Sequence, residues 1–382
     1  MSWAKYRFGD VCSMVTGKLN SNAAEKNGMY PFFTCSQETF QINEYAFDTE
    51  AVLLGGNNAA GIFPLKYYNG KFNAYQRTYI IESKDKDKLS TMFLYYSLRP
   101  VLSQFQNMSI GAATQYLTKS ILDNFEIKLP TILEQRKIAS ILSAYDSIIE
   151  NNRRRIHLLE RSARLLYREW FVHLRFPGHE HVRIIDGVPE GWEKGTVSDF
   201  YKTKSGSTPS RKNPDFFTGE INWVKTQELQ DGFIFETDEK ITEDAVSNSS
   251  AKLFPVNTVL VAMYGATIGQ TAILGNPAAT NQACCAVFPD AKQTHYIHAY
   301  LFLRENKNGL INLSQGAAQK NISQEIIKNY QMTMPSKMIM TEFIESLEPV
   351  FVQIKNLQLQ NSKLKNARDI LLPRLMNGEI TV

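Results

Sequence analysis

Cysteine is scarce in this chain of 382 residues, which contains only four. Cys12 and Cys35 are isolated and Cys284 and Cys285 are adjacent, so there is no CxxC pair and no spacing typical of a zinc site. Adjacent cysteines cannot form a disulfide without straining the backbone. A disulfide-stapled fold and a thiolate zinc site are therefore excluded, and we expect reduced, buried thiols.

Long apolar runs are also missing. No stretch has the length of a membrane span, and the N-terminus has no charged segment followed by an apolar one. We therefore expect a soluble, cytoplasmic protein without a membrane partner. Because 43% of the residues are apolar and 11% are aromatic, we expect folded domains along the whole chain, and the length suggests two or three of them.

The chain has no large excess of either charge. Its 42 lysines and arginines face 38 aspartates and glutamates, which leaves a formal net charge of +4. Proteins that hold nucleic acid by phosphate neutralisation alone are usually more basic. Any DNA binding must therefore use local patches of charge or borrow charge from a partner.

Enzyme signatures are absent as well. We find no GxxxxGK[ST] or GxGxxG loop, no HExxH, no glycine-rich S-adenosylmethionine loop and no Asn-Pro-Pro-Tyr-like tetrad. The closest metal-like patterns are His179-Glu180-His181 in a linker and His295 with His298 beside tyrosines, for which surface or core roles are favoured. We expect a non-catalytic chain that binds no metal and no cofactor of its own.

What the sequence does contain is a heptad pattern from Leu133 to Trp170. Apolar residues recur at alternating spacings of four and three, with Asn152 as the one polar interruption, which is typical of one strand of a coiled coil. These apolar positions are Ile138, Leu142, Tyr145, Ile149, Ile156, Leu159, Ala163, Leu166 and Trp170.

The pattern returns 205 residues later, again with one asparagine. The second set is Phe343, Leu347, Val350, Ile354, Leu357, Asn361, Leu364, Arg368, Leu371 and Leu375. The parts that precede the helices also repeat, because Gly316-Ala317-Ala318 matches Gly111-Ala112-Ala113, Trp192 to Asp199 matches Trp3 to Asp10, and Gly206 matches Gly17. The order globular domain, helix, globular domain, helix therefore predicts a pseudo-two-fold molecule.

The two helices fit each other antiparallel if residue i faces residue 513 minus i. This register pairs Asn152 with Asn361, and a slip by one heptad would place both amides against apolar partners. The register also predicts a Tyr145–Arg368 cation–π layer and a Trp170–Phe343 layer. Pro349 and Pro373 predict a kink near 349 and fraying after 372.

These observations predict a mixed α/β (α+β) fold, with two similar globular domains joined by two long helices that form an antiparallel coiled coil. We place the first globular domain at residues 1–130, the first helix at 131–175, a linker at 176–190, the second globular domain at 191–335 and the second helix at 336–382. Thr131 is the expected cap of the first helix, with Glu134 three residues further on.

Candidate DNA contacts lie in polar, glycine-containing loops, because amides and arginines can bond base edges while lysines and hydroxyls hold phosphates. Each of them, taken alone, also fits a solvated turn. The candidates are Lys18, Asn20, Asn57, Asn58, Tyr67, Lys71, Gln115 with Tyr116, Lys204, Arg211, Lys212, Lys225 to Gln227, Tyr264, Gln319, Lys320 and Asn321. Gln76 and Gln282 hold equivalent positions beside β-like runs, which favours a structural role.

A basic run, Arg153-Arg154-Arg155, lies on the first helix and is followed by Arg161, Arg164 and Arg168. Such a run fits a solvated helix face equally well as a surface that docks an acidic partner or the DNA backbone.

Three segments carry a resemblance to a known family: Pro130 to Ala139 with its Leu-Glu-Gln-Arg core, Trp192 after Pro189-Glu190-Gly191, and the tail from Arg368 to Ile380. Together with the order of domains, they resemble the specificity (S) subunits of type I restriction-modification enzymes. The second helix begins Met338-Ile339-Met340-Thr341-Glu342 and lacks the Glu-Gln-Arg signature.

The resemblance implies that the globular units are target recognition domains and that the helices are spacers. The expected partners are double-stranded DNA, two methyltransferase (M) subunits and restriction (R) subunits, which would themselves use S-adenosylmethionine, ATP and Mg. The chain would direct a site-specific deoxyribonuclease and adenine methyltransferase to a bipartite, asymmetric site. The alternative hypothesis is a coiled-coil scaffold whose globular ends bind proteins.

Overall fold

The computed structural model describes residues 3–59, 61–111, 113–289, 294–314 and 321–382. The chain divides into two compact units: unit 1 comprises Met1–Ile149 and Lys363–Val382, and unit 2 comprises Glu150–Ser362. Each unit therefore contains one globular domain and a part of both long helices. Among the described residues, no helix combines the length and the apolar character needed to cross a membrane.

The first heptad segment forms the helix α5 (Ile132–Tyr167), which has 36 residues. Its cap is the predicted one, since Thr131 Oγ1 accepts a hydrogen bond from the backbone N–H of Glu134 at 3.3 Å. A short π-helical turn (Arg168–Val172) follows α5, and Leu174 then adopts a left-handed φ of 58°, which turns the chain away from the helix axis.

The second heptad segment forms α11 (Lys337–Met376), which has 40 residues. The fraying predicted after residue 372 is wrong, because the helix continues through Pro349 and Pro373 to Met376. Leu372 and Leu375 are buried in the core of unit 1, and this burial stabilises the last turn although Pro373 has no N–H to donate.

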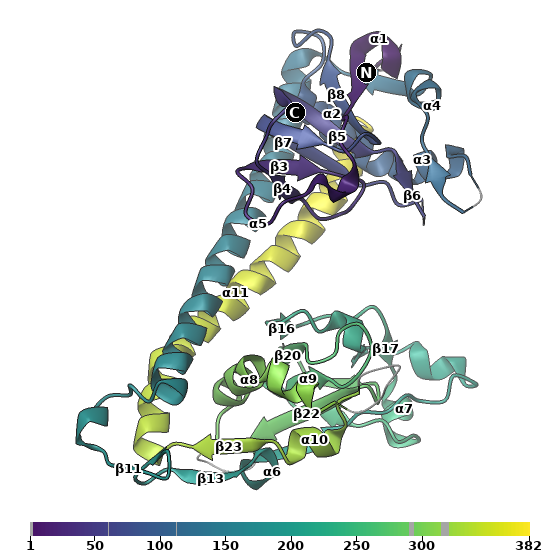
Figure 1. Ribbon diagram of the computed structural model, residues 1–382. Helices are drawn as coiled ribbons and strands as arrows, with labels where there is room; N and C mark the ends of the chain where they lie inside the picture. The colour runs from purple at the N-terminus through teal and green to yellow at the C-terminus, as the bar shows by residue number, and fades with distance from the viewer. Residues whose placement is uncertain (1–2, 60, 112, 290–293, 315–320) are drawn as a thin grey trace. The chain divides into compact units, whose positions relative to one another are not determined.

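Unit 1 is built on a six-stranded sheet of order β2-β8-β5-β7-β3-β4 (Figure 1). Only β3 and β7 are parallel neighbours. Along β5 successive side chains face opposite sides: Val52 and Leu54 join the core under α2, whereas Ala51 and Leu53 join a smaller core on the other face. The strands are β2 (Cys12–Thr16), β3 (Tyr30–Phe33), β4 (Phe40–Ile42), β5 (Phe47–Gly55), β7 (Leu65–Ala74) and β8 (Thr78–Ser83).

Two smaller ladders complete unit 1. They pair β1 (Ala4–Arg7) with β10 (Glu126–Leu129), and β6 (Asn57–Asn58) with β9 (Gln115–Tyr116). The helices of the globular part are α1 (Phe8–Val11), α2 (Thr91–Leu98), α3 (Leu102–Met108) and α4 (Lys119–Asp123).

Unit 2 repeats this plan with one five-stranded sheet, β14-β22-β19-β20-β16, and one four-stranded sheet, β17-β15-β21-β18. The first consists of β14 (Tyr201–Ser205), β16 (Phe233–Ile234), β19 (Val259–Ala262), β20 (Thr271–Leu274) and β22 (Cys284–Pro289). The second consists of β15 (Ile221–Val224), β17 (Lys240–Ile241), β18 (Leu253–Phe254) and β21 (Ala278–Thr280). Two further ladders pair β11 (Ile184–Ile185) with β12 (Val188–Pro189), and β13 (Glu193–Thr196) with β23 (Gln331–Met334). The helices of the globular part are α6 (Val197–Phe200), α7 (Glu243–Ser247), α8 (Tyr296–Glu305), α9 (Lys307–Asn312) and α10 (Gln324–Lys328).

The repeat read from the sequence is present in the strand registers. In unit 1 Thr16 pairs with Tyr79 and Val52 with Ile81. In unit 2 Ser205 pairs with Cys285 and Val259 with Val287, which are the same positions at offsets of 189, 206 and 207. The three-strand core β2-β8-β5 therefore corresponds to β14-β22-β19, and the insertions fall in the segments between these strands.

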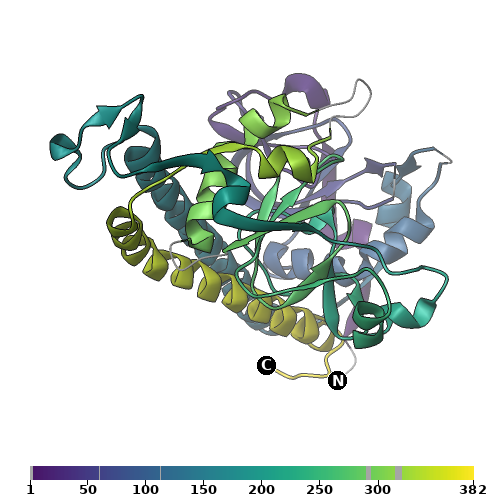
Figure 2. The ribbon, with the colours of Figure 1, turned by 90° about the horizontal axis from the view of Figure 1, so that it is seen from below.

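In each unit the segments of α5 and α11 run side by side (Figure 2). In unit 2, buried Asn152 donates through Nδ2 to Asn361 Oδ1 and to Gln360 Oε1, both at 3.0 Å. Trp170 and Phe343 contact each other with ring centroids 5.5 Å apart. The asparagine pair and the aromatic layer are thus found where the antiparallel register places them.

In unit 1 the partner of Arg368 differs from the predicted one. Its guanidinium bonds the carboxylates of Asp146, the neighbour of Tyr145, and of Asp369 at 2.7 Å. Asp146 also accepts from Tyr96 Oη at 2.7 Å. Burial lowers the pKa of Arg368, but its bonds to Asp146 and Asp369 outweigh this effect and raise the pKa. The structure therefore has an ion-pair network here rather than a cation–π layer, because a carboxylate one residue away offers the cation a stronger partner.

Gln135, which the sequence marks only as part of a family signature, is completely buried. Its Oε1 accepts from Ser90 N at 3.0 Å, and its Nε2 donates to Lys88 O at 2.9 Å and to Pro130 O at 3.0 Å. One amide therefore ties the first turn of α5 to the segment that precedes α2.

All four thiols are free, as expected. Three of them are buried, and burial raises the pKa of Cys12 and of Cys285 to about 12. Cys35 differs from the expectation because it is only partly buried, and its thiol donates to the carbonyl of Arg77 at 3.4 Å.

A buried histidine lies between the long helices and the globular part of unit 2. His298 Nδ1 is 3.0 Å from Tyr201 Oη, and its ring packs against Tyr167 and Phe171. Burial lowers the pKa of His298 to about 3, with a smaller contribution from His295. The imidazole is therefore neutral in the folded protein across the physiological range, and the predicted core role of this histidine agrees with its surroundings.

We expect acid to destabilise unit 2 through His298. The unfolded chain protonates this residue near pH 6.5 whereas the folded chain does not until about pH 3, so stability falls as the pH drops through this window. Between pH 7 and pH 5 the loss should be about 2 kcal/mol, at ~1.4 kcal/mol per pH unit below 6.5. Urea unfolding of the His298→Gln variant should lose this part of the pH dependence, while the variant of exposed His157, His157→Gln, should keep it. An identical pH dependence in His298→Gln and the wild-type chain would contradict this assignment.

Candidate nucleic-acid interface

Three turns of unit 1 meet at one edge of its sheet. The segment after β2 reaches the turn between β7 and β8, where Gln76 N donates to Leu19 O at 2.9 Å and Gln76 Nε2 donates to Asn20 Oδ1 at 3.0 Å. Gly17 permits this approach, since a Cβ at this position would lie 1.9 Å from Ala74 O. The exposed candidates Lys18 and Asn20 are thereby placed beside Gln76.

The third turn belongs to the ladder of β6 and β9. Asn57 pairs with Tyr116 and Asn58 with Gln115, so the structure brings together four of the predicted residues. Gln115 is occupied locally, because it accepts from Ser109 Oγ and donates to Gly111 O, both at 2.8 Å. Asn57 Oδ1 is buried and has no hydrogen-bond partner among the described residues.

Arg77 is a residue of this edge that the sequence reasoning missed. Its backbone carbonyl accepts from Gly56 N at 2.7 Å, and its guanidinium lies over the ring of Tyr116 with 5.1 Å between the guanidinium carbon and the ring centroid. The signal that points to it is its neighbour Gln76, whose counterpart Gln282 holds the same position in unit 2. Both glutamines form hydrogen bonds at the edge of their unit, which agrees with the structural role predicted for them.

Tyr67 and Lys71 are not brought into this set of contacts. Tyr67 Oη donates to Glu50 Oε1 at 2.9 Å and its ring packs on Tyr95, so burial and this bond raise the pKa of Tyr67. Lys71 lies over the ring of Tyr45, with its Nζ 4.6 Å from the ring centroid. The polar sequence around Tyr67 suggested an exposed contact residue, but β7 directs its side chain toward Tyr95 of α2.

Unit 2 has the equivalent edge with other side chains. Ser207 N donates to Thr280 O at 2.8 Å, and Thr208 Oγ1 donates to Gln282 Oε1 at 2.5 Å. Ile322 N donates to Met263 O at 2.7 Å, which corresponds to the bond from Leu117 N to Gly56 O in unit 1. Asn321 and Tyr264, the residues next to this bond, therefore hold the positions of Tyr116 and Asn57.

Arg211 is held by side chains of its own unit. Its guanidinium carbon lies 4.0 Å from the ring centroid of Phe217 and 5.2 Å from that of Trp223. It pairs with Glu239 at 2.6 Å, and Glu239 also bonds Lys225 Nζ at 3.0 Å. The bonds from Arg211 and Lys225 lower the pKa of Glu239, so this carboxylate remains charged and offsets one of the two cations.

The other candidates of unit 2 are Lys204, Lys212 and Gln227, which are exposed. Lys204 lies on β14, and Lys212 follows Arg211 in the loop after it. Gln319 and Lys320 lie outside the described residues. The predicted DNA-contact residues therefore remain candidates. Several of them lie together at the edges of the two units, whereas Tyr67 and Lys71 do not.

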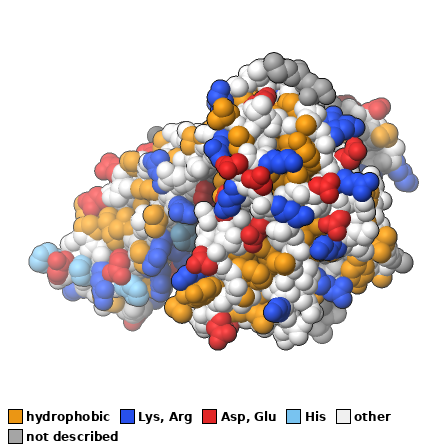
Figure 3. All heavy atoms as spheres, turned by 90° about the horizontal axis from the view of Figure 1, so that it is seen from above, with side chains coloured by type: hydrophobic (Ala, Val, Ile, Leu, Met, Phe, Trp, Pro, Cys, Tyr) orange, Lys and Arg blue, Asp and Glu red, His pale blue; other side chains and the backbone are white. Residues whose placement is uncertain are grey.

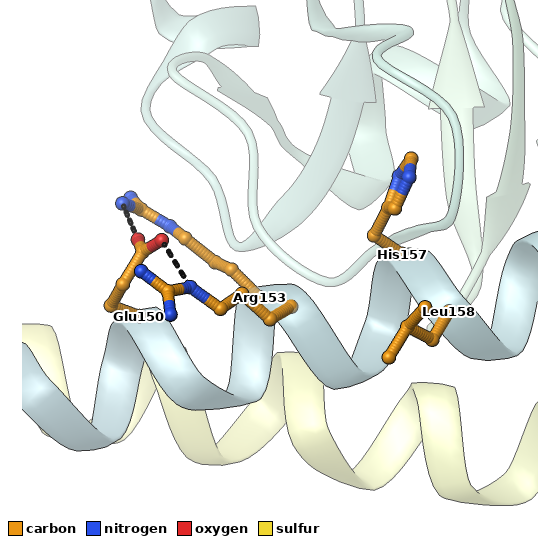
Figure 4. A pocket seen from close by; sticks show the side chains of 5 residues that line it. Glu150, Arg153, His157 and Leu158 are labelled. Carbon is orange, nitrogen blue, oxygen red and sulfur yellow. Dashed lines mark hydrogen bonds and ion pairs between the residues drawn. The ribbon is translucent and has the colours of Figure 1, made fainter. Parts of the chain in front are cut away.

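Four of the six arginines of the basic run, which are Arg153, Arg154, Arg164 and Arg168, have carboxylate partners within unit 2. Glu150 pairs with Arg153 at 3.7 Å and Arg154 at 3.3 Å (Figure 4), and Glu305 of α8 pairs with Arg164 at 3.0 Å and Arg168 at 3.3 Å. Leu158 is 61% exposed and points to another side of α5 than His157 (Figure 4). The exposed surface of α5 in unit 2 therefore carries an apolar side chain beside paired charges.

Basic and acidic side chains are interspersed over the face shown in Figure 3, and neither sign gathers into a broad field. This agrees with the small net charge of +4. The electrostatics of the edges are therefore local, and they depend on single cations such as Lys18 and Arg77.

Comparison with known proteins decides the family. A family model described as type I restriction modification DNA specificity domain matches residues 1–161 and 189–366. The chain belongs to this family. The resemblance stated from the Glu-Gln-Arg segment and the domain order is thereby confirmed.

Similar curated proteins are specificity subunits of type I restriction enzymes. The EcoDI subunit of Escherichia coli is 40% identical over 156 residues, which cover 41% of this chain and 34% of that subunit. The MjaIX subunit of Methanocaldococcus jannaschii is 28% identical over 306 residues, 78% of this chain and 71% of that subunit. The match to the EcoDI subunit thus spans about a third of its length. These relatives agree with the prediction of a non-catalytic specificity subunit.

A solved structure of similar fold is the crystal structure of a type I restriction-modification system S subunit from M. genitalium. It matches with a TM-score of 0.65 at 15% sequence identity, over 98% of this chain and 96% of that chain. The fold class predicted from the sequence, a mixed α/β fold with two similar domains and two long helices, is confirmed by this match.

Proposed function

We propose that this chain is the subunit that reads DNA for a type I restriction-modification system, and that its target is bipartite and asymmetric. The edge of unit 1 reads one half-site and the edge of unit 2 reads the other. The observation that carries the proposal is the repetition of one backbone arrangement with different side chains at equivalent positions.

The differences between the two edges are chemical rather than geometric. Asn57 and Tyr116 of unit 1 are replaced by Tyr264 and Asn321 in unit 2. Base edges are distinguished by their patterns of donors, acceptors and methyl groups, so exchanged side chains on one scaffold select different sequences. Two unlike edges on one chain therefore support a target with two unlike halves.

We propose further that α5 and α11 dock two methyltransferase subunits, and that restriction subunits join the same complex. Large apolar side chains on these helices support this proposal, since Leu158, Leu165, Val352 and Ile370 are between 50% and 62% exposed. The partners would supply S-adenosylmethionine, ATP and Mg chemistry. This chain contributes recognition, and no group of three or more His, Cys, Asp or Glu side chains able to hold a metal is found among its described residues.

We expect the chain alone to bind duplex DNA weakly and with a shallow salt dependence, because its edges offer few unpaired cations. Adding the methyltransferase subunit should steepen the slope of log affinity against log salt by roughly 0.9 for each further phosphate contacted. Fluorescence anisotropy with duplex DNA across a salt series measures both slopes.

The same experiment separates this function from a protein-binding scaffold. A scaffold would leave the DNA affinity of the methyltransferase subunit unchanged when the chain is added. Tight, sequence-specific binding by the chain alone would contradict a readout that depends on a partner's charge.

A further inference from the structure

The most distinctive cation at the edges is Arg77 of unit 1. It is exposed, and in the described part of the chain no carboxylate pairs with its guanidinium. Several other arginines near the cores have such partners: Arg99 and Arg368 pair with Asp146, Arg211 with Glu239, and Arg304 with Asp231. Arg77 therefore keeps its hydrogen-bond donors available.

Arg77 is nevertheless held in place. Its backbone carbonyl is fixed by the N–H of Gly56 at 2.7 Å and by the thiol of Cys35 at 3.4 Å. Its planar guanidinium lies over the ring of Tyr116, and Tyr116 is itself fixed by the β6–β9 ladder. A guanidinium held over an aromatic ring by cation–π attraction has its freedom of movement reduced while its hydrogen-bond donors stay unused.

The side chains around Arg77 are polar, and one of their buried atoms lacks a hydrogen-bond partner. Asn57, opposite Tyr116 in the ladder, has a buried Oδ1 that lacks a hydrogen-bond partner. The amides of Gln76, the residue before Arg77, and of Asn20 bond each other at 3.0 Å. A bonded amide pair and an arginine without a carboxylate partner at one edge fit a surface whose partner offers hydrogen-bond acceptors, as base edges do.

We infer that Arg77 determines specificity by donating two hydrogen bonds to the O6 and N7 of a guanine in the major groove of the half-site read by unit 1. Tyr116 is its positioning residue. This inference rests on the proposed function and adds a named base to it. The equivalent position in unit 2 is Ala283, which is buried, so unit 2 has no arginine at this position of its edge.

The test is a selection of randomised duplex DNA by the complex of this chain with its methyltransferase subunit. The variant Arg77→Lys keeps the charge and loses the fork, so we expect one guanine position of one half-site to relax and the discrimination there to fall by about 5- to 150-fold, which corresponds to the 1–3 kcal/mol of a bidentate contact. Arg77→Ala should relax the same position. Tyr116→Leu should relax it in part, whereas Tyr116→Phe, which keeps the ring, should not.

The matched control is Arg7→Lys, which changes an exposed arginine on β1 of the same unit and should leave the selected sequence unchanged. Exchange of the second globular domain identifies the half-site that unit 1 reads. If the wild-type complex selects a bipartite sequence and Arg77→Lys selects the same one, or loses affinity equally for all sequences, the inference is overturned and the proposed function stands. If the wild-type complex selects no sequence, both fail.

Discussion

Exchange of residues 190–335 for the equivalent domain of a relative with another target is expected to change one half of the recognised sequence completely and to leave the other half intact. The reason is that unit 2 has its own sheets and its own core, which contains no residue of unit 1. The selected sequence of the hybrid, compared with the sequences of both parents, is the measurement.

The structure shows which contacts the hybrid must keep. Unit 2 packs its globular part on its helices through Tyr167 with His298, whose ring centroids lie 5.9 Å apart, and Tyr300 with Phe351, whose centroids lie 5.9 Å apart. Gln358 Oε1 also accepts from Phe233 N at 2.9 Å. A donor domain that conserves His298 and Tyr300, the residues that contact the retained helices, provides the folded control. A hybrid with both half-sites altered would refute modular readout.

The second large effect is expected at Gln135. The variant Gln135→Leu places an apolar side chain in a completely buried position and leaves Ser90 N, Lys88 O and Pro130 O without their partner, of which the bond to Pro130 is buried and the other two are partly buried. Since each unsatisfied buried group costs roughly 1–3 kcal/mol and the segment can relax in part, we expect a loss of about 2 to 4 kcal/mol in the free energy of unfolding. Urea unfolding of the full chain measures this loss.

The second repeat supplies the matched control for Gln135. The equivalent residue is Met340, which is buried and apolar. Met340→Leu conserves volume and leaves no polar group unpaired, so it should cost less than about 1.5 kcal/mol. Equal losses in the two variants would mean that the amide network of Gln135 contributes nothing beyond packing. A loss of methyltransferase binding in Gln135→Leu without a loss of stability would instead indicate that this residue acts in docking the methyltransferase.

The long helices and their register were accessible from the sequence because a heptad pattern is local and continues over ten seam positions in each helix. Asn152 and Asn361 were predictable as partners, since one buried amide requires another. The partner of Arg368 was not, because periodicity gives the layer of a side chain but not the competition between Tyr145 and the carboxylate of Asp146. The last turn of α11 was underestimated because the burial of Leu375 outweighs the effect of Pro373.

The candidate interface was accessible only in part. Polar loops pointed to Asn57 and Asn58, and the β6–β9 ladder places them beside Tyr116 and Gln115. The same reasoning included Tyr67, whose hydroxyl is bonded to Glu50, because composition does not show which face of a strand a residue occupies. It passed over Arg77, because the position of its guanidinium over the ring of Tyr116 depends on a contact across 39 residues of chain.

The most direct measurement of the central claim is a genome-wide map of adenine methylation in cells that carry this chain with its methyltransferase and restriction partners, before and after removal of this chain alone. The proposed function predicts methylation at one bipartite, asymmetric sequence with a fixed gap, and complete loss of that methylation when the chain is removed. Methylation that persists unchanged without the chain, or that follows a single continuous sequence, would contradict readout by two unlike edges.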